Sequence, residues 1–211
     1  AMLSRYSSLS NRILLETMPE VDYLDVIMKA MTNSKHIMFT FKDTESNASG
    51  ELIAAPLCLK TYHNRWYLAV MLHNDISNIK VFCLDQRIQG VEMADSKFKL
   101  PANFDAEDIF EEYFGVRINH PNDPDHAERI VLRAYKDQRY KWLYQPLHHS
   151  QKLHDKLGED YADFEYHMRI TYDFVSYLES LGRYVEVLEP RWLREELVRV
   201  HTDAIERNKI S

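Results

Sequence analysis

The hydrophobic positions near the start of the chain follow a helical spacing and then change to the two-residue period of strands. Leu24, Ile27 and Met31 repeat at intervals of three and four within residues 21–31, which predicts an amphipathic helix. After residue 35, short segments rich in β-branched, aromatic and aliphatic residues alternate with turn-forming residues. The pattern predicts five strands, at residues 36–42, 51–60, 65–72, 79–84 and 87–93.

Five strands with such short connections can cover an apolar interior only by pairing antiparallel and curling, because a flat open sheet leaves one face and both edges bare. We therefore expect a small barrel, with a bulge, bend or edge at Pro56. Alternation along the third strand places Trp66 and Leu68 on one face and Tyr67 on the other. Trp66 then belongs to the core, since a bulky indole beside a leucine fills an interior.

Strand and helix patterns alternate in the second half of the chain. A helix is expected at residues 104–115, and Pro121 and Pro124 mark residues 119–125 as a linker. Beyond this linker we expect a sandwich of four strands and two or three helices. The strands are expected at residues 129–135, 149–154, 164–171 and 185–187, and the helices at residues 138–144, 173–181 and 190–204.

These patterns predict a mainly β part followed by an α+β part. The expected order is a helical lead-in at residues 1–34, a five-stranded β-barrel at 35–100, a docking helix with a proline-containing linker at 101–125, and an α/β sandwich at 126–211.

Charge and composition limit the classes of function. The 211 residues carry a formal net charge of −7, which argues against a protein that covers duplex DNA with a broad face. A local basic pocket remains compatible with this charge. The longest apolar runs are far shorter than the roughly 20 residues that cross a bilayer, so we expect a cytoplasmic protein.

The usual motifs of enzymes and metal sites are absent from the sequence. It contains no Gly-x-Ser-x-Gly, P-loop, dinucleotide fingerprint or His-Glu-x-x-His pattern, and only five glycines. Cys58 and Cys83 lie in strand-like segments without metal-ligand spacing, so we expect reduced core residues. We therefore expect a binding module that is not an enzyme and that uses no cofactor or metal.

Motifs spread over nearly the whole chain resemble a known family of regulators. The first half resembles the WYL domain in Pro56-Leu57, Arg65-Trp66-Tyr67-Leu68, Lys80-Val81-Phe82-Cys83-Leu84-Asp85, Phe98-Lys99-Leu100-Pro101 and Phe104-Asp105. The second half resembles that family's C-terminal extension in Leu147-His148-His149-Ser150-Gln151-Lys152, Val185-Glu186-Val187-Leu188-Glu189-Pro190 and Leu193-Arg194-Glu195.

The resemblance implies an Sm-like barrel, a ferredoxin-like extension, and a role as the effector and dimerisation part of a bacterial transcriptional regulator. Such regulators usually begin with a winged helix-turn-helix and respond to nucleic-acid ligands such as single-stranded DNA. No winged helix-turn-helix precedes residue 20, so we expect this chain not to read promoter DNA by itself. The resemblance therefore implies a homodimer whose partners are a single-stranded nucleic acid or nucleotide effector and an upstream DNA-binding domain. Some members modulate nucleases, so the alternative is a protein-interaction accessory.

The chain departs from the family at two cations. Lys80 and Cys83 stand where the family's usual pattern has arginines, and Gln86 is inserted before Arg87-Ile88. These changes replace a planar, two-pronged donor with a point charge and remove a second cation, which reduces bidentate binding of phosphate.

Five residues of the predicted barrel are candidates for ligand binding. Tyr67 has a ring that can stack on a base and a hydroxyl that can bind a phosphate; the alternative is an ordinary surface tyrosine. Lys80 and Arg87 flank strands and can offer cations, although charges at strand ends are often only solvated. Tyr62 and His63 precede the third strand and either line the same mouth or simply fill the turn.

Arg133 and Lys136 are the ligand-binding candidates of the extension. They belong to a stretch in which cations and aromatic residues alternate, as single-stranded nucleic acid requires for its phosphates and bases. The alternative is an amphipathic strand and helix with a solvated face. The other residues of this stretch are Tyr135, Arg139, Tyr140, Lys141 and Trp142.

Overall fold

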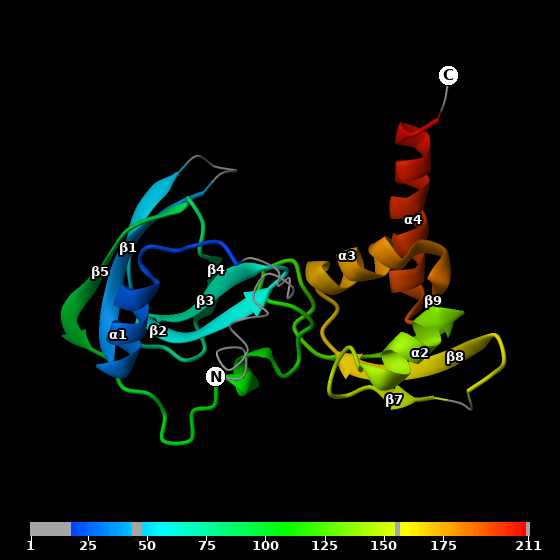
Figure 1. Cartoon of the computed structure of the whole chain (residues 1–211), viewed down its shortest axis with the longest axis horizontal. Helices are drawn as coiled ribbons and strands as arrows, with labels where there is room; N and C mark the ends of the chain where they lie inside the picture. Colours follow the sequence, from blue (N-terminus) through cyan, green and yellow to red (C-terminus); the bar gives the residue numbers. More distant parts are fainter. Residues whose placement is uncertain (1–17, 44–47, 155–156, 210–211) are drawn as a thin grey trace, which may run out of the picture. The chain divides into compact units, whose positions relative to one another are not determined.

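The computed structural model describes residues 18–43, 48–154 and 157–209 (Figure 1). The chain separates into two compact units, one ending at Pro101 and the other beginning at Ala102. Each unit contains one antiparallel sheet, so the predicted mixture of α and β structure is confirmed.

The first unit is a five-stranded antiparallel sheet preceded by one helix (Figure 1). Its strands follow the order β4-β3-β2-β1-β5. The helix and all five strands lie close to the predicted segments. They are α1 (Leu24–Thr32), β1 (Lys35–Lys42), β2 (Ser49–Tyr62), β3 (Arg65–Leu72), β4 (Ile79–Cys83) and β5 (Ile88–Lys97).

The closed barrel that we expected is not confirmed. Within the described ranges, no ladder of hydrogen bonds joins β4 to β5. Strand β4 ends at Cys83 and pairs with β3, whereas β5 pairs with β1. The two strands are therefore the opposite edges of the sheet. The β2–β3 register shifts between Pro56 and Cys58, which is the irregularity predicted at Pro56, because proline has no N–H to donate to a ladder.

Helix α1 packs on the core of this unit. Ile27 and Ala30 are fully buried and belong to one cluster with Ile37, Phe39 and Leu68 from the strands. Trp66 is partly buried against the same cluster, as the alternation of β3 predicts. Burial of these apolar side chains is the main force that holds the sheet and helix together.

The second unit contains a four-stranded sheet and three helices. The sequence of elements from β6 to β9 is β-α-β-β-α-β and the strand order is β7-β8-β6-β9, which is the ferredoxin-like arrangement. These elements are β6 (Glu128–Tyr135), α2 (Asp137–Tyr144), β7 (Lys152–Leu153), β8 (Tyr161–Met168), α3 (Tyr172–Leu181), the 3₁₀ turn η3 (Gly182–Tyr184), β9 (Val185–Glu189) and α4 (Arg191–Arg207).

The core of the second unit is formed by apolar residues from the sheet and from all three helices. Trp142 of α2 is 1% exposed and lies against Phe164 and Tyr166 of β8. Phe174 of α3 and Leu193 of α4 are fully buried in the same cluster. On β6 and β8 the other face carries mainly polar residues, among them Arg129, Arg133, Asp163 and Glu165.

The helix expected at residues 104–115 is wrong for most of its length. Only a 3₁₀ turn, η2 (Glu107–Phe110), forms there. Further on, Tyr113 makes a bridge with Arg169, and the amide of Arg169 donates to the carbonyl of Glu112 at 2.7 Å. Beyond η2 the chain continues as a turn up to this bridge, and no α-helix forms there.

Candidate functional site

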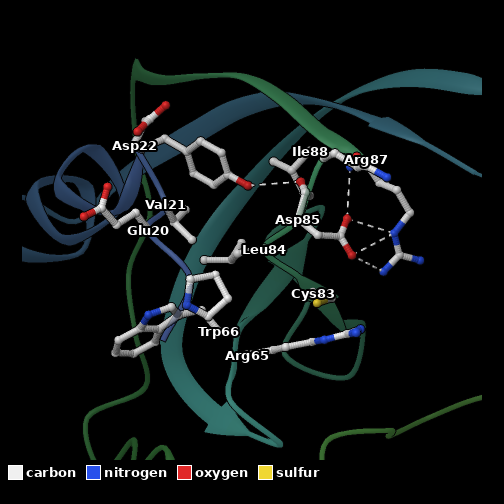
Figure 2. Close-up of a pocket in the computed structure, with 13 residues that line it drawn as sticks. Glu20, Val21, Asp22, Arg65, Trp66, Cys83, Leu84, Asp85, Arg87 and Ile88 are labelled. Carbon is white, nitrogen blue, oxygen red and sulfur yellow. Dashed lines mark hydrogen bonds and ion pairs between the residues drawn. The ribbon is translucent and has the colours of Figure 1, made fainter. Parts of the chain in front are cut away.

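A pocket of about 790 Å³ lies in the first unit (Figure 2). It is formed by three stretches of chain that meet beside the sheet. These are residues 19–23, which lead into α1, the pair Arg65 and Trp66 at the start of β3, and residues 83–88, which connect β4 to β5.

Local backbone structure brings these stretches together. His63 and Asn64 both have positive φ, 45° and 57°, as a two-residue hairpin turn between antiparallel strands requires. The turn places Arg65 and Trp66 at the beginning of β3. The amide of Leu84 then donates to the carbonyl of Trp66 at 2.8 Å, which holds the β4–β5 connection against them.

Asp85 and Arg87 form an ion pair at one side of the pocket (Figure 2). Arg87 Nε donates to Asp85 Oδ1 at 2.9 Å, and Nη2 donates to Oδ2 at 2.7 Å. Burial by itself would raise the pKa of Asp85, but the hydrogen bonds from Arg87 outweigh it and lower this pKa. Arg87, predicted to offer a cation to a phosphate, therefore has its charge balanced by Asp85.

Arg65 is the other cation of the pocket. Its side chain extends beneath Cys83 (Figure 2), and it is exposed. In the part of the chain that the structure describes, Arg65 makes no ion pair. Its planar guanidinium keeps its donors available for a carboxylate or a phosphate.

Two carboxylates, Glu20 and Asp22, also line the pocket. Figure 2 shows them on the opposite side from Arg65 and Arg87. Neither forms an ion pair with another described residue. Together with Asp85 the lining has three carboxylates against two guanidiniums, so it is a site of mixed charge with Arg65 as its available cation.

Tyr23 and Cys83 add two uncharged groups to the lining. The Tyr23 hydroxyl donates to the carbonyl oxygen of Asp85 at 3.3 Å, and burial, followed by the Asp85 carboxylate, raises its pKa to about 12. Burial also raises the pKa of the Cys83 thiol, and Asp85 acts in the same direction. Both groups therefore stay protonated near neutral pH, and the thiol lacks the thiolate character of a nucleophilic cysteine.

The structure groups three of the predicted site residues near the β2–β3 turn, outside the pocket: Tyr62, His63 and Tyr67. The ring centroids of Tyr62 and His63 are 4.1 Å apart, and those of Tyr62 and Tyr67 are 6.4 Å apart. Lys80 is not part of this cluster. Tyr67 lies opposite Cys83 and Val70 lies opposite Lys80, so alternation places Lys80 on the other face of the sheet from Tyr67.

The two predicted residues of the second unit have different surroundings. Arg133 Nε and Nη2 donate to the buried carboxylate of Asp163 at 2.8 and 2.9 Å, and its guanidinium carbon lies 3.8 Å from the ring centroid of Tyr161. The hydrogen bonds to Asp163 raise the pKa of Arg133. Lys136 is exposed between β6 and α2. Trp142 lies in the core, so it is not one of the exposed aromatic rings that single-stranded nucleic acid would need.

Arg65 and Tyr23 are pocket residues that the sequence alone did not suggest. Arg65 directly follows the His63-Asn64 turn, and a cation at the start of a strand after such a turn is a sequence signal that could have identified it as a site residue. Tyr23 gave no comparable cue, because its contact with Asp85 spans 62 residues of chain.

The described residues contain neither a metal-binding cluster nor a membrane-spanning helix. No group of three or more His, Cys, Asp or Glu residues there is placed to hold a metal ion. No helix in the same ranges is long and apolar enough to cross a membrane.

Comparison with solved structures shows similarity at low sequence identity. The chain is similar to the proteasome accessory factor B/C (PafBC) of Arthrobacter aurescens, with 18% identity and a TM-score of 0.40 over 94% of this chain and 29% of that one. It is also similar to a CRISPR Cas-related protein, with 14% identity and a TM-score of 0.47 over 87% of this chain and 50% of that one. The chain thus spans half or less of the length of these two structures. No curated protein matches it.

Family models match both halves of the chain. Residues 22–93 match the model described as the WYL domain, which confirms the resemblance of the first half. Residues 123–205 match the model described as the WCX domain. The chain therefore carries a WYL domain in its first unit and a WCX domain in its second.

Proposed function

We propose that this chain is the ligand-sensing and dimerisation module of a bacterial transcriptional regulator, and that its ligand is a nucleotide or the terminal nucleotide of a single strand. The module acts by binding, without catalysis, and works in the cytoplasm. It transmits the effect of ligand binding to a winged helix-turn-helix domain in the full-length regulator. The observation that carries the proposal is the WYL-domain pocket in which Arg65 is the available cation.

The lining of the pocket is complementary to a molecule with one anionic group and several hydrogen-bond donors. Arg65 can donate two parallel hydrogen bonds to a phosphate. On the other side, Glu20 and Asp22 can accept hydrogen bonds from the exocyclic amino group of a base, and Trp66 offers an apolar ring. The volume of about 790 Å³ is within the usual range for small-molecule sites. A nucleotide combines these features.

The charge of the pocket favours a single phosphate. Because Asp85 balances Arg87, Arg65 alone is available to neutralise a phosphate. A long strand bound through many phosphates would require more cations than this lining provides. We therefore expect one phosphate contact and a weak dependence of affinity on salt.

Regulation requires that the ligand bind two states of the dimer with different affinities. A ligand that binds both states equally shifts neither, however tightly it binds. In this proposal, the state with the open pocket is the one that the nucleotide stabilises, and the DNA-binding domains follow the change in dimer geometry.

Equilibrium titration followed by fluorescence anisotropy tests the proposal. The probe is a short single-stranded DNA with a fluorescent label, and unlabelled deoxynucleoside monophosphates compete with it. We expect saturable binding, competition by the monophosphates, and a loss of about 10-fold or more in affinity for Arg65→Ala, because hydrogen bonds to charged groups contribute about 1.5–3 kcal/mol.

Lys80→Ala is the matched control, because it removes an exposed cation from the same sheet outside the pocket. We expect it to bind like the unmodified protein. We expect a slope of log affinity against log salt concentration of about −0.7, which corresponds to one phosphate contact on a single strand. Equal losses for both variants, or no saturable binding, would contradict the proposal. If no saturable binding is found, the alternative is an accessory module that binds a protein such as a nuclease. Affinity purification tests this alternative.

A further inference from the structure

Tyr62, His63 and Tyr67 form an aromatic cluster near the β2–β3 turn that the pocket does not use. The ring planes of Tyr62 and His63 meet at 72°, and those of Tyr62 and Tyr67 meet at 65°. Such edge-to-face contacts hold the rings in a fixed orientation without stacking one ring on another. Tyr62 and Tyr67 are partly exposed and His63 is exposed, so the cluster reaches the surface of the first unit.

The register of the sheet connects this cluster to the pocket. Tyr62 is the cross-strand partner of Arg65, and Tyr67 is the partner of Cys83. Directly paired residues share a face of a sheet, and Arg65 and Tyr67 are two residues apart on one strand, so all four side chains belong to the same face. Arg65 and Cys83 also line the pocket. The two tyrosines therefore continue the surface that begins with these pocket residues.

Arg65 is the cation at the border between the pocket and the aromatic cluster. Figure 2 shows its side chain beneath Cys83, and within the described ranges it makes no ion pair. In a single strand, one phosphate joins each nucleotide to the next. A phosphate bound to Arg65 can therefore join a nucleotide in the pocket to a second nucleotide at the tyrosines.

We propose that the aromatic cluster is a second nucleotide subsite, in which the next base of a single strand stacks on Tyr67 and Tyr62. The terminal nucleotide occupies the pocket, and the phosphate that links it to its neighbour binds Arg65. His63 packs against Tyr62 and limits the movement of that ring. The inference rests on the proposed function and extends its ligand from one nucleotide to two.

Stacking and charge contribute separately to the binding of such a ligand. Every base has an aromatic face, so stacking on a tyrosine tolerates different bases. Stacking neutralises no phosphate, whereas the salt dependence of binding follows the number of phosphates that are neutralised. The second base should therefore raise the affinity and leave the salt dependence at that of one phosphate contact.

Competition titrations with dinucleotides test the inference. The competitors are d(ApA), which contains one phosphate, and two analogues of it in which a sugar without a base replaces one or the other nucleotide. All three have the same charge. We expect removal of the second base to weaken binding at least about 5-fold, which corresponds to about 1 kcal/mol, the lower end of the contribution of one stacked base. The slope of log affinity against log salt concentration should be the same with and without this base.

Tyr67→Leu shows which base lies on the tyrosines. The variant keeps an apolar side chain but has no ring, so it should lose more affinity for d(ApA) than for deoxyadenosine monophosphate. In this variant, removal of the second base should cost much less than in the unmodified protein. The analogue for which this difference appears identifies the second base and thereby the direction of the strand.

Three further variants control this result. Tyr67→Phe keeps the ring, so it should bind d(ApA) as the unmodified protein does. Tyr144→Leu removes a tyrosine that is 80% exposed on α2 of the second unit, and it should also bind normally. Circular dichroism checks the fold of each variant. If Tyr67→Leu does not fold, Tyr62→Leu takes its place, because it removes the neighbouring ring of the same cluster.

The inference is wrong if neither analogue binds more weakly than d(ApA), or if the ring-removing variant loses as much affinity for the monophosphate as for d(ApA). A loss for Tyr67→Phe as large as that for Tyr67→Leu would also overturn it, because the hydroxyl and not stacking would then hold the strand. In all these cases Arg65→Ala still weakens binding of the monophosphate. Failure of the second subsite can therefore be distinguished from failure of the pocket.

Discussion

The Asp85–Arg87 ion pair determines which cation of the WYL-domain pocket can meet a ligand. Asp85 accepts hydrogen bonds from Nε and Nη2 of Arg87 and also from the Arg87 amide at 3.0 Å. A carboxylate two residues before the arginine in a tight turn can make all of these contacts. The pair therefore stabilises the β4–β5 connection and leaves Arg65 as the available cation.

The contribution of this pair to stability should depend on pH. The pKa of Asp85 is lowered in the folded protein, so its stabilisation is present above the unfolded pKa of about 3.9 and is lost as the pH falls through the folded value. We expect Asp85→Asn to lower the free energy of unfolding by about 1 kcal/mol near neutral pH. Urea unfolding measures this difference.

The same comparison in acid is the control for this prediction. Once Asp85 is protonated, the unmodified protein and Asp85→Asn should have nearly equal free energies of unfolding. An undiminished difference at a pH well below about 3 would mean that the pair is not the cause.

At the residue scale, the sequence indicated cations but not their partners. Arg133 was a candidate for phosphate binding because of its charge and its aromatic neighbours. Its partner Asp163 is 30 residues away and is placed opposite it only by the register of β6 and β8. Long-range register of this kind depends on the packing of the whole unit, which local patterns do not contain.

Among the elements, the turn at Gly115 connects η2 to the core of the second unit. Gly115 has a φ of 85°, and Asp173 in the first turn of α3 accepts hydrogen bonds from the amides of Val116 and Arg117 at 2.8 and 2.9 Å. A Cβ atom at Gly115 would lie 2.4 Å from Asp173 Oδ2. The absence of a side chain at this position lets the carboxylate reach both amides.

Gly115→Ala should therefore be strongly destabilising. We expect a loss of about 2–3 kcal/mol, because the variant combines an unfavourable backbone conformation with displacement of a carboxylate. Gly50→Ala is the control: Gly50 lies in β2 and has no atom within 4 Å of the position of a Cβ. Urea denaturation that gave the same free energy of unfolding for both variants would rule out this role of Gly115.

At the element scale, periodicity predicted most helices and strands of the fold. It succeeded where an apolar face and a period agreed, as in α1 and the five strands of the first unit. It failed at residues 104–115, where the apolar spacing is helical but Tyr113 pairs with Arg169. Tertiary pairing overrode local propensity there.

At the scale of the whole chain, the pocket proposed for a nucleotide is built from residues of the first unit. A ligand can control dimer geometry only if its binding energy differs between two states of the whole protein. The resemblance of the sequence motifs predicted both domains, but the pocket residues became visible only when distant stretches of chain were brought together.

The most direct test of the ligand pocket is the ¹⁵N–¹H spectrum of the tryptophan side chains during titration with a deoxynucleoside monophosphate. The protein has three tryptophans, and only Trp66 lines the pocket. Trp142 is buried, with its indole N–H donating to Tyr177, and Trp192 donates to Glu128 on the surface of the second unit. We predict that the Trp66 signal shifts and saturates while the Trp142 signal stays in place. A Trp66 signal that does not move while the nucleotide binds, or a shift confined to Trp142 and Trp192, would contradict the assignment of the ligand to this pocket.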